Sequence, residues 1–369
     1  MTTALVTGSA GFVGRNLCTR IDSMPGLTVL PYDIGDAPVL LEEYAKKADV
    51  VVHLAGVNRP KNPADYVYGN RDFTANVLSL LRDSGRCVTF IFSSSIQVAQ
   101  DNPYGMSKKA AEDLINEWSR ATRNKAIIYR LPNLFGKWCR PNYNSVVATF
   151  CHNLANGLPI RVDNPDTELV LAYIDDVVAE FLRAISAEPH IGEDGFGYIP
   201  RTFRITLGAL AEKIRAFSDS RHTLMIPDLS QDFDRFLYAT YVSYLPETAY
   251  SLDLKKDNRG WFSEFLKSGE AGQISISRTR PGITRGNHWH HTKTEKFLVV
   301  EGEAVIRLRQ VGSDEVTEIR VSGQELQPVD IPPGYTHSIT NIGKTDLVTL
   351  FWASEIFDPS RPDTIYLEV

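Results

Sequence analysis

The stretch VTGSAGFVG, residues 6–14, decides the fold of the first half of this chain. It lies between an apolar run, Ala4–Thr7, and a helical pattern. Gly8 permits a tight turn, and Gly11 and Gly14 let backbone N–H groups approach a pyrophosphate at the N-terminus of a helix. Because glycines often only make turns, GxxGxxG by itself is a weak signal. Between a strand and a helix, it predicts a dinucleotide-binding site.

The residues up to about 130 alternate between short apolar runs and amphipathic segments. Two long segments, Tyr66–Leu81 and Tyr104–Ala121, have a helical pattern. Such alternation is typical of βαβ units, so we expect an α/β Rossmann-type, doubly wound parallel sheet. The expected strands are Ala4–Thr7, Thr28–Tyr32, Val50–Leu54, Thr89–Phe92 and Ala126–Tyr129.

The pattern changes near Tyr244–Glu247, and beyond it almost no helical period remains. Short strand-like runs are separated by Gly and Pro, which indicates an all-β sandwich or barrel. We therefore expect two domains, residues 1–246 and 247–369. The later runs are Gln273–Ser277, Lys296–Val300, Ala304–Leu308, Val316–Val321 and Leu347–Trp352.

Composition excludes several classes of protein. A net charge of −6 over 369 residues argues against general binding to nucleic acid or to anionic membranes. The 4 cysteines are scattered and form no CxxC pair, as expected for reduced thiols. The chain starts without a signal-peptide pattern and has no run of about 18 apolar residues. We expect a cytoplasmic protein.

Three polar side chains indicate carbonyl chemistry. Ser95 ends a serine run after an apolar strand, and Tyr104 and Lys108 are spaced to share one face of a helix. We expect the Lys108 ammonium to lower the pKa of Tyr104 and so make it a usable acid. A serine hydroxyl at the strand end is placed to bind the reacting carbonyl oxygen. YxxxK alone is common by chance, but together with the glycine motif it is specific.

A second cluster lies in the C-terminal third. His288, His290, Glu295 and His337 form an N/O ligand set of the kind that holds Zn, Fe, Mn or Ni. Residues two apart in a strand point to the same face, so His288 and His290 can enter one cavity. The alternative is a set of unrelated surface histidines. Since 4 of the 8 histidines lie between 288 and 337, we favour a metal site.

The N-terminal motifs resemble the extended short-chain dehydrogenases/reductases (SDRs) of the sugar-nucleotide type. TGSAGFVG, HLAG at 53–56, the serine triplet and YGMSK at 104–108 carry the resemblance. It implies Ser95, Tyr104 and Lys108 as the catalytic group and Asn133 as a substrate-binding residue. Only eight residues separate Ser95 from Tyr104, so the loop over the substrate is expected to be shorter than in many relatives. The implied cofactor-binding residues are Gly8, Gly11, Phe12, Val13, Gly14, Arg15, Asp33, Leu54, Ala55, Gly56, Tyr104 and Lys108.

Two residues bear on the choice of cofactor. Asp33 ends the second strand region, where a carboxylate would bind an adenine ribose and favour NAD. Arg15 follows Gly14 and is placed to pair with a 2′-phosphate instead. We expect NADPH, because the whole chain resembles a group of enzymes, described below, for which NADPH is the implied cofactor.

The His/Glu pattern resembles the two motifs of the cupin superfamily, although the second motif lacks its first glycine. The resemblance implies that His288, His290, Glu295 and His337 are metal ligands, with Zn²⁺ preferred. Segments 257–264 and 285–288 are also similar to sugar-nucleotide 3,5-epimerases, which implies substrate binding by Arg259, Glu264 and Arg285. In those epimerases the residue matching His288 is a general base. We favour a ligand, because His290 and Glu295 have no purpose in the metal-free pattern.

Over its full length the chain resembles bifunctional enzymes of capsular polysaccharide synthesis, in which an SDR is fused to a cupin barrel. HLAGVNRP, LFGKWCRPNYNSV and GNHWHHTKTEKFLVV are among the matching stretches. The resemblance implies that the cupin epimerises C3 of UDP-2-acetamido-2,6-dideoxy-4-hexulose. The SDR domain then reduces the C4 ketone with NADPH, giving UDP-2-acetamido-2,6-dideoxy-L-talose on the route to UDP-N-acetyl-L-fucosamine.

The same resemblance implies a small-molecule nucleotide-sugar substrate, no nucleic-acid or membrane partner, and a homodimer. Two other interpretations remain open. One is an NAD-dependent sugar-nucleotide epimerase/dehydratase with a structural cupin domain, and the other is a non-catalytic sugar-nucleotide sensor. The sequence also leaves open which residue is the epimerase base and whether the metal is catalytic or structural.

Overall fold

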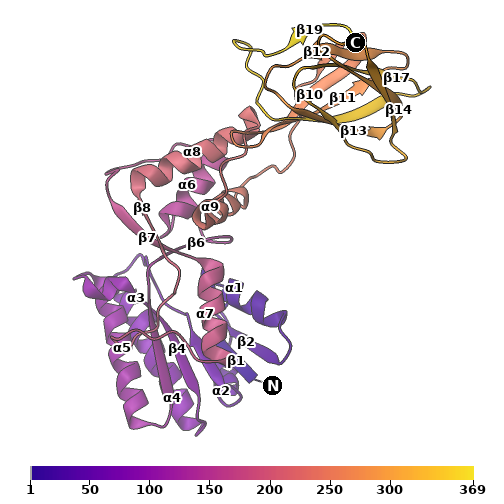
Figure 1. The fold of residues 1–369 in the computed structure, drawn as a ribbon. Helices are drawn as coiled ribbons and strands as arrows, with labels where there is room; N and C mark the ends of the chain where they lie inside the picture. Colours follow the sequence, from indigo (N-terminus) through magenta and orange to yellow (C-terminus); the bar gives the residue numbers. More distant parts are fainter. Residues whose placement is uncertain (1) are drawn as a thin grey trace. The chain divides into compact units, whose positions relative to one another are not determined.

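The computed structural model describes residues 2–369. The chain forms two compact units, and Figure 1 shows their elements. The first contains the residues up to 215 together with 230–246, and the second contains 216–229 and 247–369. None of the helices in the described part is long and apolar enough to cross a membrane.

The first unit is built on a five-stranded parallel sheet in the order β2-β1-β3-β4-β5. Successive strand residues point to opposite faces, so Val6 packs under one helical layer and Leu5 under the other. Helices cover both faces, which confirms the predicted doubly wound sheet. The strands are β1 (Thr2–Thr7), β2 (Leu27–Tyr32), β3 (Val50–His53), β4 (Thr89–Ser95) and β5 (Lys125–Leu131).

The two helical layers bury different sets of apolar side chains. On one face α1 (Phe12–Asp22) and α7 (Ile174–Ser186) contribute Leu17 and Phe181, both fully buried. On the other face α2 (Pro38–Ala45), α4 (Phe73–Asp83) and α5 (Pro103–Ala121) contribute residues such as Trp118.

The helix expected at Tyr66–Leu81 is interrupted. Its start is α3 (Ala64–Tyr66), followed by a π-helical turn, η1 (Val67–Asp72), and then α4. The turn lies against Val57, because a Cβ at Gly69 would stand 2.3 Å from the Val57 side chain. Such turns are common at functional sites, and they leave no mark on hydrophobic periodicity.

The rest of the first unit contains a small sheet, β6-β7-β8, with helices beside it. The helix α8 begins in this unit, and its residues from 216 onward belong to the second unit. The elements are β6 (Asn133–Phe135), α6 (Val146–Ala155), β7 (Glu168–Tyr173), β8 (Phe203–Thr206), α8 (Leu207–Thr223) and α9 (Asp232–Val242). A 3-10 turn, η2 (Ile96–Ala99), makes up half of the short connection between Ser95 and Tyr104.

The second unit consists of two sheets that share a core, which confirms the predicted all-β barrel class. The sheet orders are β16-β13-β18-β11-β10-β9 and β15-β14-β17-β12-β19. Phe297 and Leu347 from the first sheet pack with Ile306 and Ile339 from the second. The strands are β9 (Lys255–Asp257), β10 (Gly260–Ser268), β11 (Gly272–Thr279), β12 (Thr284–Trp289), β13 (Glu295–Glu301), β14 (Glu303–Gln310), β15 (Val316–Ser322), β16 (Val329–Ile331), β17 (Tyr335–Asn341), β18 (Leu347–Ala353) and β19 (Ile365–Tyr366).

Segment 216–229 belongs to this unit although its residues show no strand pattern. The Ile226 N–H donates to the carbonyl of Lys267 (2.7 Å), and the Lys267 N–H donates to Leu224 (2.8 Å). Backbone pairing of this kind needs no side-chain pattern, so the sequence could not indicate it.

Candidate functional site

The glycine loop between β1 and α1 has room only for glycine. Gly8 has φ +72°, and a Cβ there would lie 2.7 Å from the Ala55 nitrogen. A Cβ at Gly14 would lie 2.1 Å from the Gly8 oxygen. No side chain caps α1 at Gly11, so the backbone donors of its first turn, from Phe12 and Val13 onward, remain for an anionic ligand. The predicted cofactor residues Leu54, Ala55 and Gly56 follow β3 beside this loop.

The two residues that bear on cofactor choice have different partners. The Asp33 carboxylate accepts hydrogen bonds from the N–H groups of Ala10 (2.6 Å) and Ile34 (2.7 Å). The Arg15 guanidinium lies 4.4 Å from the centre of the Trp138 ring. No ion pair with a carboxylate engages Arg15 within residues 2–369, so its charge is available to an anion.

The predicted catalytic residues come together at the end of β4. Asn102 caps α5 by accepting a hydrogen bond from the Gly105 N–H (2.8 Å), which places Tyr104 in the first turn and Lys108 in the next. The Lys108 ammonium is buried and donates to the carbonyl of Ser93 (2.9 Å). Tyr104 is hydrogen-bonded to Ser95 and to Asn58, a partner that sequence reasoning missed.

The prediction that the pKa of Tyr104 is lowered is wrong for the chain without a bound cofactor. Burial raises the pKa of Tyr104 to about 12, and the hydrogen bonds with Ser95 and Asn58 only partly oppose it. Burial also lowers the pKa of Lys108 to about 8, opposed by the charge of Glu112. Tyr104 is therefore a protonated phenol at neutral pH, which suits a group that gives a proton to a ketone oxygen.

Two buried polar residues support this site. Asn70, in the π-helical turn, binds both the N–H (2.8 Å) and the carbonyl (3.0 Å) of Val57, and donates to the Ser107 hydroxyl (2.8 Å). His53 lies between the hydroxyls of Thr7 (2.7 Å) and Thr74 (3.0 Å). Burial lowers the pKa of His53 to about 3, so it is a neutral structural residue.

Asn133, the predicted substrate-binding residue of the first unit, is the first residue of β6 and is exposed. Within residues 2–369 no hydrogen bond or ion pair joins its side chain to Tyr104, so its substrate role stays a prediction.

The structure brings the four predicted metal ligands together. His288 of β12 lies directly opposite His337 of β17, after a bulge at Asn287, whose φ is +59°. His290 follows β12, and Glu295 begins β13 in the other sheet. One ligand atom from each of these four residues lies within 4.8 Å of the others.

The surroundings of this cluster fit a divalent metal. His290 and His337 each bury an Nε2 atom that has no hydrogen-bond partner, and these atoms lie 3.5 and 3.2 Å from the Glu295 carboxylate. The Nδ1 of His290 lies 2.5 Å from the Asp363 carbonyl, which orients the ring and leaves Nε2 for a ligand.

The charges of the cluster also suit a metal. Burial and the neighbouring His337 lower the pKa of His288 to about 4. Burial raises the pKa of Glu295, but the adjacent His290 and His337 side chains outweigh it and hold that pKa well below its usual range. At neutral pH the cluster thus offers a neutral His288 imidazole and a carboxylate.

The predicted substrate-binding residues of the second unit differ in their surroundings. Arg259 is an exposed side chain paired with Asp257 in the turn before β10. Glu264 pairs with Lys267 at 3.0 Å. Arg285 donates from Nε to the Thr279 hydroxyl (2.9 Å), and its buried Nη2 has no hydrogen-bond partner, although it lies 4.0 Å from the Asp257 carboxylate. Arg285 is therefore the one of the three with a buried donor left for a ligand.

Two hydroxyls inside the barrel were missed by sequence reasoning. Ser277 and Thr349 are direct neighbours across β11 and β18, and both bury an oxygen without a hydrogen-bond partner. A signal existed in β11, where the buried positions 273, 275, 277 and 279 are Gln, Ser, Ser and Thr. A strand whose buried side is polar indicates a binding cavity, because a packed core would be apolar there.

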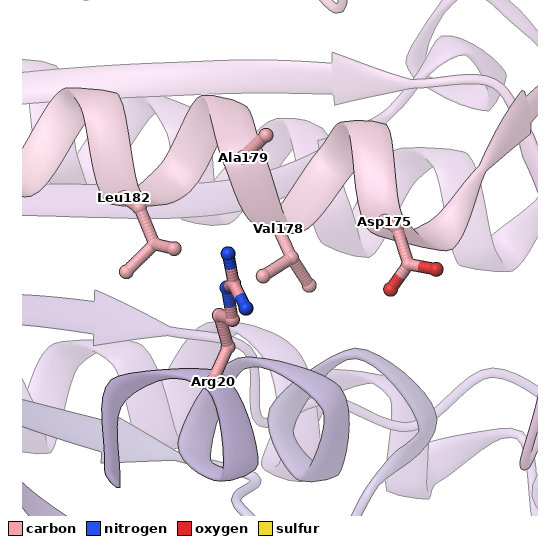
Figure 2. Close-up of a pocket in the computed structure, with 5 residues that line it drawn as sticks. All are labelled: Arg20, Asp175, Val178, Ala179 and Leu182. Atoms are coloured by element: carbon pink, nitrogen blue, oxygen red, sulfur yellow. The ribbon is translucent and has the colours of Figure 1, made fainter. Parts of the chain in front are cut away.

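One hollow lies away from both clusters. It measures about 420 Å³ and lies between α1 and α7, where Figure 2 shows Arg20 among Asp175, Val178, Ala179 and Leu182. None of the predicted site residues lines it, so we assign it no function.

Comparison with known proteins places this Rossmann unit and β-barrel among sugar-nucleotide reductases and epimerases. The chain belongs to the NAD dependent epimerase/dehydratase family, which matches residues 4–194. Residues 255–365 match the polysaccharide biosynthesis C-terminal domain.

Similar proteins cover the whole chain. A UDP-2-acetamido-2,6-β-L-arabino-hexul-4-ose reductase of Pseudomonas aeruginosa is 41% identical over 98% of this chain and 97% of its own length. The capsular polysaccharide assembling protein CapF of Staphylococcus aureus is 47% identical, with a TM-score of 0.93 over 99% of this chain and 100% of its own. A structure of CapF with the inhibitor 3-isopropenyl-tropolone is 43% identical, with a TM-score of 0.90 over 100% of both chains. The predicted resemblance to bifunctional capsule enzymes is confirmed.

Gly14→Ala is expected to abolish binding of the dinucleotide, because its Cβ would stand 2.1 Å from the Gly8 oxygen. Titration with NADPH, followed by fluorescence, measures the loss, which we expect to exceed about 100-fold in Kd. Gly269→Ala is the matched control, since nothing lies within 4 Å of a Cβ there. Equal binding by the Gly14 variant and wild type would contradict the assignment of this loop.

His337→Ala is expected to remove most of the bound metal, because His337 supplies a buried, unpartnered Nε2. Metal analysis after incubation with Zn²⁺ and gel filtration measures the effect, expected to be at least about tenfold in affinity. His291→Ala is the control, because His291 is an exposed neighbour outside the cluster. Similar metal content in wild type and both variants would show that the cluster is not a metal site.

Proposed function

We propose that the chain is a bifunctional sugar-nucleotide enzyme with one reaction in each unit. The barrel epimerises C3 of UDP-2-acetamido-2,6-dideoxy-4-hexulose, and the Rossmann unit reduces the C4 ketone to give UDP-2-acetamido-2,6-dideoxy-L-talose. The similarity to a UDP-hexulose reductase over 98% of the chain supports the substrate class. The observation that carries the proposal is that the barrel buries polar side-chain atoms without hydrogen-bond partners. The same chain also has a protonated tyrosine, Tyr104, in a site with a buried lysine, Lys108.

The reduction follows from the state of Tyr104. NADPH, when bound, supplies the hydride that reaches C4. The Tyr104 phenol gives its proton to the ketone oxygen, and the Ser95 hydroxyl holds that oxygen in place. The positive charge of Lys108 stabilises the tyrosinate left behind. Arg15, which has no carboxylate partner in the described chain, supports NADPH as the cofactor because it can pair with a 2′-phosphate.

The epimerisation follows from the ketone at C4, which acidifies the C–H bond at C3. Removing that proton gives an enolate, and returning it to the other face inverts C3. Arg285, Ser277 and Thr349 supply buried donors without hydrogen-bond partners for the negative charge and for the sugar's polar groups. A Zn²⁺ ion held by His288, His290, Glu295 and His337 would act as a Lewis acid or keep the site in shape.

Reduction consumes the epimerised ketone and so pulls an unfavourable epimerisation forward. A homodimer stays a prediction from the resemblance.

Incubation of the 4-keto sugar in deuterated water without NADPH separates the two reactions. Wild type is expected to place deuterium at C3, detected by NMR. Tyr104→Phe is expected to keep this exchange while reduction falls by about 10²–10⁴-fold, because only the proton donor to the C4 oxygen is lost. His337→Ala is expected to lose the exchange.

No deuterium at C3 with wild type would refute the epimerase reaction. Loss of both exchange and reduction in a folded Tyr104→Phe variant would refute the division of work between the units.

A further inference from the structure

A buried carboxylate adjoins the reductase site without belonging to the Ser/Tyr/Lys group. Glu112 lies on α5 one turn after Lys108 and is 1% exposed. Its Oε1 accepts hydrogen bonds from the Ser94 hydroxyl (2.5 Å) and from Arg130 Nε (3.1 Å), and its Oε2 accepts one from Arg130 Nη2 (2.7 Å). Both oxygens are therefore engaged, and the carboxylate is fixed in place.

Ser94 links this carboxylate to the catalytic group. It stands between Ser93, whose carbonyl accepts the Lys108 ammonium, and Ser95, which is hydrogen-bonded to Tyr104. In a strand the side chains of Ser93 and Ser95 point to one face, and that of Ser94 points to the other. Fixing Ser94 from behind therefore fixes the backbone that presents both functional neighbours.

Arg130 completes the arrangement from the next strand. It is paired with Ser94 in the register of β4 and β5, and its guanidinium lies 3.7 Å from the centre of the Phe196 ring. Its side chain is 31% exposed, whereas that of Glu112 is 1% exposed. The Glu112 end of the pair is thus shielded from solvent, whereas the Arg130 end is partly exposed.

The charge of Glu112 acts on the Lys108 ammonium, which has few other charged neighbours in the described part of the chain. Glu112 interacts with it from α5 and His53 from β3, but His53 is neutral because its pKa is lowered to about 3. The Phe92 ring lies 4.6 Å from the ammonium. Glu112 is the group whose charge opposes the effect of burial on Lys108.

We propose that Glu112 is a positioning residue of the reductase site. Through Ser94 it holds the end of β4 in the geometry that presents Ser95 and the Ser93 carbonyl, and its charge keeps Lys108 protonated. This inference rests on the proposed ketone reduction at Tyr104.

Glu112→Gln tests the charge, because an amide can still accept the Ser94 hydrogen bond. Removing the negative charge lowers the pKa of Lys108 further, so the fall of kcat/KM at high pH is expected to move down by about 0.5–1 pH unit. We expect kcat at neutral pH to fall by no more than about twofold, because a Lys108 pKa lowered from about 8 toward 7 still leaves about half of the ammonium protonated, and we expect the KM for NADPH to change by less than about twofold. Ser94→Ala tests the geometry: kcat falls, while the pH profile keeps its position.

Glu117→Gln is the matched control, because Glu117 is an exposed carboxylate on the same helix. Thermal melting checks that each variant is folded. A Glu112→Gln variant with the wild-type pH profile, or a Ser94→Ala variant with full kcat, would overturn the proposal. A uniform loss of activity at every pH would show a purely structural role and would also overturn it.

A readout without turnover separates this inference from the proposed function. In protein labelled with [ε-¹³C]lysine, the Lys108 resonance is expected to titrate near 8 in wild type and lower in Glu112→Gln. If wild type does not reduce the keto sugar, the proposed reaction fails, and an unchanged titration in Glu112→Gln refutes the role of Glu112 independently.

Discussion

Burying a polar group costs about 1–3 kcal/mol when no hydrogen bond replaces the one it made to water, and both sites of this chain depend on that cost. The Ser/Tyr/Lys site meets it internally, since Lys108 donates to Ser93 and His53 lies between two threonine hydroxyls. The barrel leaves it unmet at His290, His337 and Arg285. The buried polar groups of the first site therefore have hydrogen-bond partners within the chain, whereas those of the second site need a ligand as a partner.

The fold of each unit brings the residues of its site together. A parallel sheet brings the carboxyl ends of β1, β3 and β4 to one edge, where the glycine loop, Gly56 and Ser95 meet. The barrel faces two sheets toward each other, so that His288 from one and Glu295 from the other share a cavity. Each site draws residues from distant parts of the sequence, and only the strand order explains why they meet.

The sequence was sufficient where spacing has a single structural meaning. GxxGxxG after a strand predicted the turn at Gly8, and alternation predicted the parallel sheet and the barrel. It was insufficient where the outcome depends on tertiary contacts. The π-helical turn that holds Asn70 has no periodicity of its own, and the raised pKa of Tyr104 comes from burial that no neighbour in sequence reveals. Ser277 and Thr349 became visible only when the barrel placed them side by side.

The central claim is that one keto sugar reacts at two adjacent carbons in one chain, and following two hydrogens tests it most directly. Wild type converts the sugar either with NADPH deuterated at C4 of the nicotinamide in ordinary water, or with unlabelled NADPH in deuterated water. NMR of the product is expected to show deuterium at sugar C4 only in the first case and at sugar C3 only in the second. A product made in deuterated water that carries no label at C3 would contradict the account.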